Sequence, residues 1–267
     1  MAPFRVTRRE LLKLGGAWLA TSALGVKGSE AATAPVIGLI FPPANRPAPD
    51  EAGMMYPAGV KFLVTGLGLG KMTPEGYDSV IPKVANAAKE LRDKGAQGIA
   101  LMGTSLTFYK GAEFNRKLTQ SMREATGLPC VTMSTAIIEG LKAVNGKRLA
   151  VATAYQDEVN RRLVAFLNES GFQAESIKGL SIEKIDDLDK VTDDTLMALC
   201  GDVCRSAQNA DALLISCGGL VTLRIHVALE KQYKLPVVSS TPAALWAAMR
   251  MMGLSGRAAG LGRLLEI

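Results

Sequence analysis

Short apolar runs alternate along the chain with longer stretches in which apolar positions recur at helical spacing. The runs end near glycine, proline or hydroxyl side chains, which is typical of buried strands in a parallel sheet. We therefore predict strands at Val36–Phe41, Gly98–Met102, Pro129–Met133, Arg148–Thr153, Ala212–Ser216 and Pro236–Ser239.

The stretches between these runs predict helices. Gly127 and Gly171 follow two of the stretches directly, at the position after a helix where glycine is favoured. Helices that alternate with strands predict an α/β fold, in which crossover helices join parallel strands. The predicted helices are Ser79–Lys94, Ala112–Thr126, Ala136–Val144, Glu158–Ser170, Asp193–Ala207, Leu223–Tyr233 and Pro242–Met252.

The pattern repeats within the chain. Val36–Ile40 resembles Leu149–Thr153, and Ile99–Gly103 resembles Leu213–Cys217 at nearly the same separation along the chain. Such a repeat predicts two similar subdomains, each a short parallel sheet flanked by helices. We expect a pseudo-two-fold relation between them, with the functional site in the cleft where their strand ends meet.

A third match extends the repeat. Leu128–Val131 resembles Leu235–Val238 at a slightly shorter separation. From the repeat we expect residues 35–145 to form an N-terminal α/β half and residues 146–241 a C-terminal one. The closing helix, residues 242–252, is expected to pack back on the first half.

Residues 1–34 have the pattern of a twin-arginine signal peptide. Thr7–Lys13 contains the paired Arg8 and Arg9, and the apolar stretch Leu14–Val26 after it is too short to span a bilayer. Small residues suited to a signal peptidase follow. We expect export by the twin-arginine machinery to a bacterial periplasm, or a cytoplasmic protein if the signal is not used. The alternative is a frayed, basic, amphipathic N-terminus.

The charge of the chain argues against a nucleic-acid partner. The 31 basic and 25 acidic residues give a net charge of +6, but the segment 1–34 holds five of the basic and two of the acidic ones, so half of that net charge remains without it. No basic block with interleaved aromatic residues is left. We also expect no stable membrane anchor.

Four cysteines and one histidine limit the possible chemistry. The spacings of Cys130, Cys200, Cys204 and Cys217 match no zinc pattern, and His226 cannot complete one. Cysteines placed one turn apart on a helix face do not favour a disulfide. A single histidine also weakens any Cys-His or Ser-His-Asp proposal, so we interpret His226 as an ordinary helix residue and expect no metal.

The segment Leu213–Leu220 places a thiol at the end of a strand. Cys217 follows the apolar run directly, and Gly218 and Gly219 allow backbone N–H groups to turn toward a bound anion. Open α/β sheets bind ligands at this end of their strands. The alternative is that Cys217 is a small buried apolar residue, as free cysteines commonly are.

Three other strand ends offer groups to the same cleft: Pro42-Pro43, Gly103-Thr104-Ser105 and Tyr155. Their hydroxyl and phenol groups are donors suited to a carboxylate or an enediolate. The alternative for Thr104 and Ser105 is to cap a helix that begins before Leu106, and the alternative for Tyr155 is a half-buried aromatic residue.

Gly66–Thr73 is rich in glycine but does not fit a nucleotide-binding loop. The dinucleotide pattern requires glycine at Lys71, and the phosphate-loop pattern requires serine or threonine at Met72. We interpret the segment as a flexible apolar loop that lies over the cleft.

These residues together resemble the aspartate/glutamate racemase superfamily, and within it the arylmalonate decarboxylase family, over residues 36–250. The resemblance is specific because many segments carry it at once. They are Gly66–Gly70, Thr73–Tyr77, Met102–Leu106, Phe108-Tyr109, Met122–Cys130, Thr132–Ala136, Ala152–Tyr155, Ser216–Leu220 and Pro236–Ser240.

The resemblance implies a cofactor-free carboxy-lyase whose partner is a small-molecule dicarboxylate, an α-aryl or α-alkenyl malonate. One carboxylate would lie in a dioxyanion hole and the other in an apolar pocket, and Cys217 would protonate the resulting enediolate. The resemblance assigns Thr104, Ser105, Tyr155 and the Gly218 N–H to the hole. It assigns the lining of the site to Pro42, Gly103 and Gly219, and the apolar pocket to Leu69, Met72, Leu106, Ile185 and Leu188.

Racemases of this superfamily use a cysteine on each face of the substrate. Gly103 occupies the second position here, which favours a decarboxylase. A maleate-isomerase-like or racemase-like enzyme, and a two-lobed periplasmic carboxylate-binding protein, are the alternatives. Met72 and the segment Ile185–Leu188 differ in size from the small aliphatic residues usual in the family, so the shape of the substrate stays open.

Overall fold

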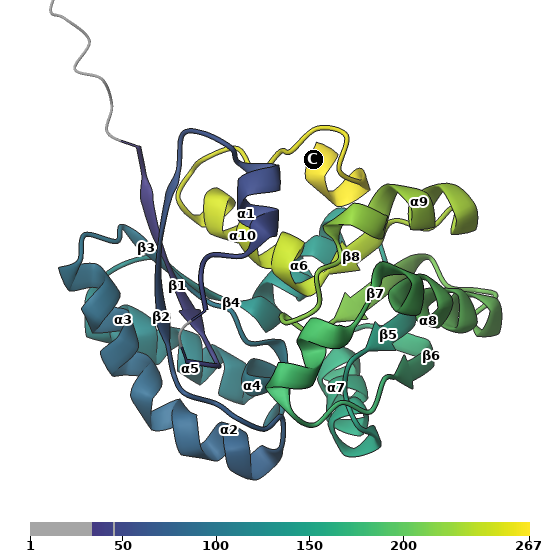
Figure 1. Ribbon diagram of the computed structural model, residues 1–267, viewed down its shortest axis with the longest axis horizontal. Coiled ribbons are helices and arrows are strands. Elements are labelled where there is room, and N and C mark those ends of the chain that lie inside the picture. Colours follow the sequence, from purple (N-terminus) through teal and green to yellow (C-terminus); the bar gives the residue numbers. More distant parts are fainter. Residues whose placement is uncertain (1–33, 45) are drawn as a thin grey trace, which may run out of the picture. The chain divides into compact units, whose positions relative to one another are not determined.

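Two four-stranded parallel sheets form the framework of the computed structural model, which describes residues 34–44 and 46–267 (Figure 1). The sheets have the strand orders β2-β1-β3-β4 and β6-β5-β7-β8, so corresponding strands occupy corresponding places. This confirms the predicted fold of two similar α/β subdomains. The strands are β1 Val36–Phe41, β2 Lys61–Gly66, β3 Gly98–Leu101, β4 Cys130–Thr132, β5 Arg148–Thr153, β6 Gln173–Gly179, β7 Ala212–Ser216 and β8 Val237–Ser239.

Helices cover the sheets. In the first half, α3 packs on β1 and β2 and also contacts α5, and in the second half α8 packs on β5 and β6. The α-helices are α1 Asp50–Met55, α2 Pro74–Val80, α3 Val84–Asp93, α4 Thr104–Phe108, α5 Gly111–Thr126, α6 Met133–Ala143, α7 Asp157–Glu169, α8 Asp193–Ser206, α9 Leu223–Tyr233 and α10 Ser240–Met251. Short 3-10 helices lie at Ile81–Lys83, Ile185–Lys190 and Arg263–Glu266.

Helices α6 and α10 connect the two sheets. Helix α10 follows β8 in the second sheet, yet it also contacts β3 and β4 of the first sheet and packs along α6. Helix α6 in turn contacts both β4 and β8. Residues 34–267 therefore form one compact unit, and the ends of strands from both sheets are held at fixed places by shared helices.

The structure corrects two of the predicted helices. The helix predicted at Ser79–Lys94 is divided into α2, a 3-10 turn and α3, because Pro82 has no N–H to continue the helical hydrogen bonds. Helix α6 begins at Met133 rather than at Ala136. Its N-cap is Thr132, whose hydroxyl accepts the Thr135 N–H at 3.2 Å.

Two edge strands and two short helices were not among the elements predicted from the sequence. Strands β2 and β6 pair with one neighbour each, and most of their side chains are only partly buried. Edge strands of this kind lack the continuous apolar run that marks a strand buried on both faces. Helices α1 and α4 have six and five residues, which is too short to show helical periodicity.

The predicted twin-arginine signal falls on residues 1–34 and thus lies almost entirely outside the described residues. Among the helices of residues 34–44 and 46–267, none has both the length and the apolar character needed to cross a bilayer. All four cysteines are free and buried. His226 lies on α9 as predicted, with Nε2 2.7 Å from Ser239 Oγ, and burial lowers its pKa to about 4.

Candidate active site

The ends of β1, β3 and β7 surround a cavity of about 200 Å³. This volume is below the roughly 300–1,000 Å³ of pockets that take drug-sized ligands, so the cavity suits a small acid. Most of the predicted site residues lie together on its wall. Those that line it are Pro42, Met72, Gly103, Thr104, Ser105, Ile185, Leu188, Cys217, Gly218 and Gly219.

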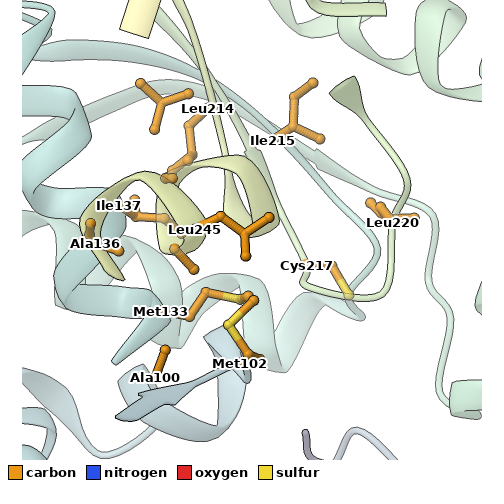
Figure 2. Packing of buried hydrophobic residues seen from close by; sticks show 14 of the residues in the cluster. Ala100, Met102, Met133, Ala136, Ile137, Leu214, Ile215, Cys217, Leu220 and Leu245 are labelled. Atoms are coloured by element: carbon orange, nitrogen blue, oxygen red, sulfur yellow. The ribbon is translucent and has the colours of Figure 1, made fainter. Parts of the chain in front are cut away.

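Cys217 lies directly after β7, on the turn that leads to Leu220 (Figure 2). Its side chain lines the cavity although only 5% of the residue is exposed. Burial raises the pKa of the thiol to about 11, and the Gly219 and Leu220 N–H groups, the Tyr155 hydroxyl and the Arg46 cation oppose that rise. The thiol is therefore protonated at neutral pH, which suits a proton donor rather than a nucleophile.

A hydroxyl group from α10 joins the strand ends of the two halves. Ser240 Oγ accepts the Cys217 N–H at 3.0 Å and lies 2.9 Å from Thr104 Oγ1. The sulfur of Met133 lies 2.9 Å from the same threonine oxygen. Ser240 ends the segment Pro236–Ser240, which carries part of the family resemblance, but neither spacing nor residue type predicted that it would lie between Thr104 and Cys217.

Thr104 and Ser105 belong to the first turn of α4, whose N-cap is Gly103. Neither side chain caps the helix, contrary to one interpretation of the sequence. Both residues are buried, and both line the cavity. The backbone oxygen of Thr104 accepts hydrogen bonds from the Ser134 hydroxyl at 3.0 Å and from the Thr107 hydroxyl at 2.9 Å. These bonds fix the position of the first turn of α4.

Two buried tyrosines lie close to the thiol. The Tyr155 hydroxyl is 3.3 Å from Ser216 Oγ, and burial together with the Cys217 thiol raises the pKa of this tyrosine well above its usual value. Tyr77, which lies in a segment that carries the resemblance but was not predicted as a site residue, lies near Ser105 and Cys217. Its buried hydroxyl has no hydrogen-bond partner of normal geometry among the described residues.

Three glycines allow close packing around the site. A Cβ atom on Gly103 would lie 2.5 Å from Pro42 Cγ, and one on Gly218 would lie 2.8 Å from Met133 Sδ. A Cβ atom on Gly219 would overlap Leu188. Each distance is shorter than van der Waals contact, so any side chain at these positions must displace a wall of the cavity.

The apolar residues expected around the substrate divide into two groups. Met72, Ile185 and Leu188 line the cavity, whereas Leu69 and Leu106 are buried but are not among its lining residues. Tyr155, which was expected in the dioxyanion hole, is also buried and is not among the lining residues. Backbone hydrogen bonds to two other segments hold the loop Gly66–Thr73, which was predicted to be flexible. The Leu69 N–H donates to Pro42 O at 2.7 Å, and the Met72 N–H donates to Glu183 O at 2.8 Å.

Three charged residues of the segment before and within α1 also line the cavity, and the sequence pattern did not reveal them. They are Arg46, Asp50 and Glu51. Glu51 is buried, and its Oε1 accepts the Thr222 and Leu223 N–H groups at 2.9 and 3.0 Å. Burial raises the pKa of Glu51 above its usual value. This carboxylate ties the wall of the cavity to the start of α9.

Comparisons with known proteins agree with this geometry. A profile described as arylmalonate decarboxylase matches residues 37–265. The arylmalonate decarboxylase of Bordetella bronchiseptica is 47% identical over 236 residues, which cover 88% of this chain and 98% of the relative. A liganded crystal structure of an arylmalonate decarboxylase variant, with a glycine changed to cysteine and a cysteine to serine, superposes with a TM-score of 0.84. Its identity is 46%, and the match covers 86% of this chain and 98% of that one.

The fold extends to a second group of enzymes. The maleate isomerase of Pseudomonas putida S16 superposes with a TM-score of 0.79 at 23% identity, covering 87% of this chain and 98% of that one, which shows a shared fold. The family profile spans nearly all of the described residues, and the identity to the Bordetella enzyme is far higher. The chain belongs to the arylmalonate decarboxylase family and is a carboxy-lyase.

Proposed function

We propose that this enzyme removes one carboxyl group from α-aryl or α-alkenyl malonates without a cofactor and that Cys217 protonates the product. The observation that carries the proposal is the protonated, buried thiol of Cys217 on the wall of a small cavity that also holds the hydroxyl groups of Thr104 and Ser105. Family membership supports the substrate class, because the relative from Bordetella bronchiseptica is named an arylmalonate decarboxylase.

In the first step, one malonate carboxylate accepts hydrogen bonds from Thr104, Ser105 and the Gly218 N–H on the cavity wall. Tyr155 belongs to the proposed hole through its hydroxyl, which lies close to the Cys217 thiol although the residue is not among the lining residues. The other carboxylate lies against apolar side chains such as Met72 and Leu188, where it has lost its hydration. Transfer of a carboxylate from water to apolar surroundings is costly, and its departure as neutral CO₂ removes that cost. The bond from Cα to this carboxylate breaks, and its electron pair passes to the remaining carboxylate as an enediolate.

In the second step, the enediolate takes the proton of the Cys217 thiol at Cα. An enediolate carbon is a much stronger base than a thiolate, so the raised pKa of Cys217 does not prevent the transfer, and it keeps the proton on sulfur until the enediolate forms. The thiolate then recovers a proton from water. A single donor on one face gives a single enantiomer of the product.

Incubation with phenylmalonate tests the proposal. We expect one equivalent of CO₂ and one of phenylacetate, with one solvent deuterium at Cα when the reaction runs in D₂O. For an α-methyl-α-phenyl substrate, we expect one enantiomer. Absence of CO₂ release from an array of aryl and alkenyl malonates would contradict the proposed substrate class. Conversion of maleate to fumarate at a comparable rate would instead favour the isomerase alternative.

We also propose that residues 1–34 direct the enzyme to the periplasm by the twin-arginine route. The paired Arg8 and Arg9 and the short apolar stretch after them support this proposal. The first strand begins at Val36, so removal of the signal leaves every described element in place.

A further inference from the structure

Arg46 lies on the cavity that contains Cys217, on the segment between β1 and α1. Cys217 and Thr104 are almost fully buried, whereas 27% of the Arg46 side chain is exposed. Arg46 is therefore closer to the mouth of the cavity than to its floor. Its charge nevertheless reaches the thiol, because it contributes to lowering the pKa of Cys217.

The guanidinium group of Arg46 forms an exposed ion pair with Asp189. Nη1 lies 3.0 Å from Oδ1 and Nη2 lies 3.3 Å from Oδ2, and the Asp189 side chain is 65% exposed. Asp189 belongs to the 3-10 helix that supplies Ile185 and Leu188 to the cavity wall. Ion pairs at this exposure contribute little to stability, so another carboxylate can readily take the place of Asp189.

Arg46 is the only basic residue among the described residues that line the cavity. Two acidic residues, Asp50 and Glu51, line it as well, and Glu51 is occupied by the backbone N–H groups at the start of α9. Three apolar residues of the same segment, Pro43, Pro47 and Ala48, also line the cavity. This part of the wall thus offers an apolar surface for a ring and one cation beside it.

We propose that Arg46 binds an acidic group at the far end of the substrate's α-substituent, so that the enzyme prefers malonates whose aryl or alkenyl group itself carries a carboxylate. This inference rests on the proposed function. In the proposed mechanism both malonate carboxylates bind at the floor of the cavity. One accepts hydrogen bonds from the hydroxyl groups, and the other lies among apolar side chains. A cation on the departing carboxylate would oppose its loss as neutral CO₂. The anion that meets Arg46 is therefore a third one.

Two variants of the same ion pair distinguish substrate recognition from a structural role. The substrates are phenylmalonate and (4-carboxyphenyl)malonate, and the measured quantity is the ratio of kcat/KM for the second over the first. In Arg46→Gln this ratio should fall about tenfold, as expected for loss of one charged hydrogen bond. In Asp189→Asn it should rise, because the guanidinium group loses its competitor. Arg205→Gln removes a similar exposed arginine, paired with Asp202 on α8, and should leave the ratio unchanged.

The decisive result is a ratio of kcat/KM values that falls in Arg46→Gln and rises in Asp189→Asn. If the ion pair only closes the cavity wall, Arg46→Gln and Asp189→Asn both break it and must change the ratio in the same direction. That outcome, or an equal loss on both substrates in Arg46→Gln, overturns the inference.

Calorimetric binding of 4-carboxyphenylacetate and phenylacetate separates this inference from the proposed function. Tighter binding of the dianion that is lost in Arg46→Gln supports the role of Arg46 even if no malonate is decarboxylated. Equal binding of the two acids by the unchanged enzyme contradicts the inference while leaving decarboxylation intact.

Discussion

The hydroxyl of Thr104 lies 2.9 Å from that of Ser240, although 136 residues separate them in the chain. Ser240 also accepts the Cys217 N–H, so one oxygen is shared by the proposed carboxylate-binding group of the first half and the proposed acid of the second. Because α10 packs on both sheets, this contact fixes the distance between the hole and the thiol. Such preorganised donors need no rearrangement when charge develops.

Substitution of Ser240 by alanine tests that link. We expect kcat to fall by roughly 10- to 100-fold, since small displacements of positioned groups have costs of this order. The change also leaves the buried Cys217 N–H without its acceptor, which should lower the free energy of unfolding by about 1–3 kcal/mol. Steady-state kinetics and urea denaturation measure the two effects. Ser206→Ala, on the exposed end of α8, is the matched control.

Cys217→Ala should reduce product formation by at least ~10³-fold, in the range of losing a positioned proton donor together with its site geometry. The fold should persist because the side chain is small. Circular dichroism and CO₂ release check both points. Cys204→Ala, which removes another buried free thiol, should retain activity. A Cys217→Ala enzyme with most of the original kcat would exclude the thiol as proton donor.

The pKa of Cys217 gives a pH dependence with a defined sign. In the proposed mechanism the thiol form donates the proton, so kcat should stay constant from neutral pH upward and decline only as pH approaches about 11. Alkylation by iodoacetamide requires the thiolate and should show the reverse trend, slow at pH 7 and faster toward pH 11. Rapid alkylation of Cys217 at pH 7, followed by mass spectrometry, would contradict a protonated thiol.

The buried strands and the repeat could be predicted from the sequence because β1, β3, β5 and β7 are mostly apolar and end near glycine, proline or hydroxyl side chains. It also placed Cys217 and Gly103 at corresponding strand ends, which the matching strand orders bear out. Strands β2 and β6 were not predicted because most of their side chains are only partly buried, so their sequences lack a continuous apolar run.

Contacts between distant segments could not be predicted from local pattern. Ser240 reaches Thr104 because α10 crosses to the first sheet, and Glu51 reaches the start of α9 from a six-residue helix. Neither residue has a periodicity or motif that shows its partner. Arg46 is likewise an ordinary polar residue of a proline-rich segment until the fold places Asp189 beside it.

His226 predicts a loss of stability in mild acid. Its folded pKa of about 4 lies below the usual 6.5, so the unfolded chain binds the proton more tightly. The stabilisation is complete above pH 6.5 and declines as pH falls toward 4, by up to about 3 kcal/mol. Glu51, whose folded pKa is raised, acts in the opposite sense. Urea denaturation at several pH values from 4 to 7 measures the free energy of unfolding, which should change less with pH in His226→Gln than in the unchanged protein. An identical pH dependence of the two proteins would contradict the assignment of this effect to His226.

Export should depend on the paired arginines. In the full chain, Arg8→Lys together with Arg9→Lys should keep the protein out of the periplasm, as seen by fractionation and immunoblotting. A chain that begins at Ala34 should fold cooperatively and remain active, because the first strand starts at Val36. Unchanged periplasmic appearance of the double variant would exclude the twin-arginine route.

Gly103→Cys should introduce racemisation of an α-aryl propionate and reduce decarboxylation. Residue 103 follows β3 as Cys217 follows β7, so a thiol there lies on the other half of the same cavity. Two opposed thiols allow removal of a proton from one face and its return to the other, which a single thiol does not. Decarboxylation should fall because the new Cβ lies 2.5 Å from Pro42 Cγ and must displace that ring from the cavity wall.

The measurement follows optical rotation and α-deuteration of one pure enantiomer in D₂O. Gly103→Ala separates the two effects: it creates the same contact with Pro42 and should lower decarboxylation, but it brings no thiol and should not racemise. A folded Gly103→Cys enzyme that neither exchanges the α-proton nor loses optical rotation would show that residue 103 does not face the α-carbon opposite Cys217.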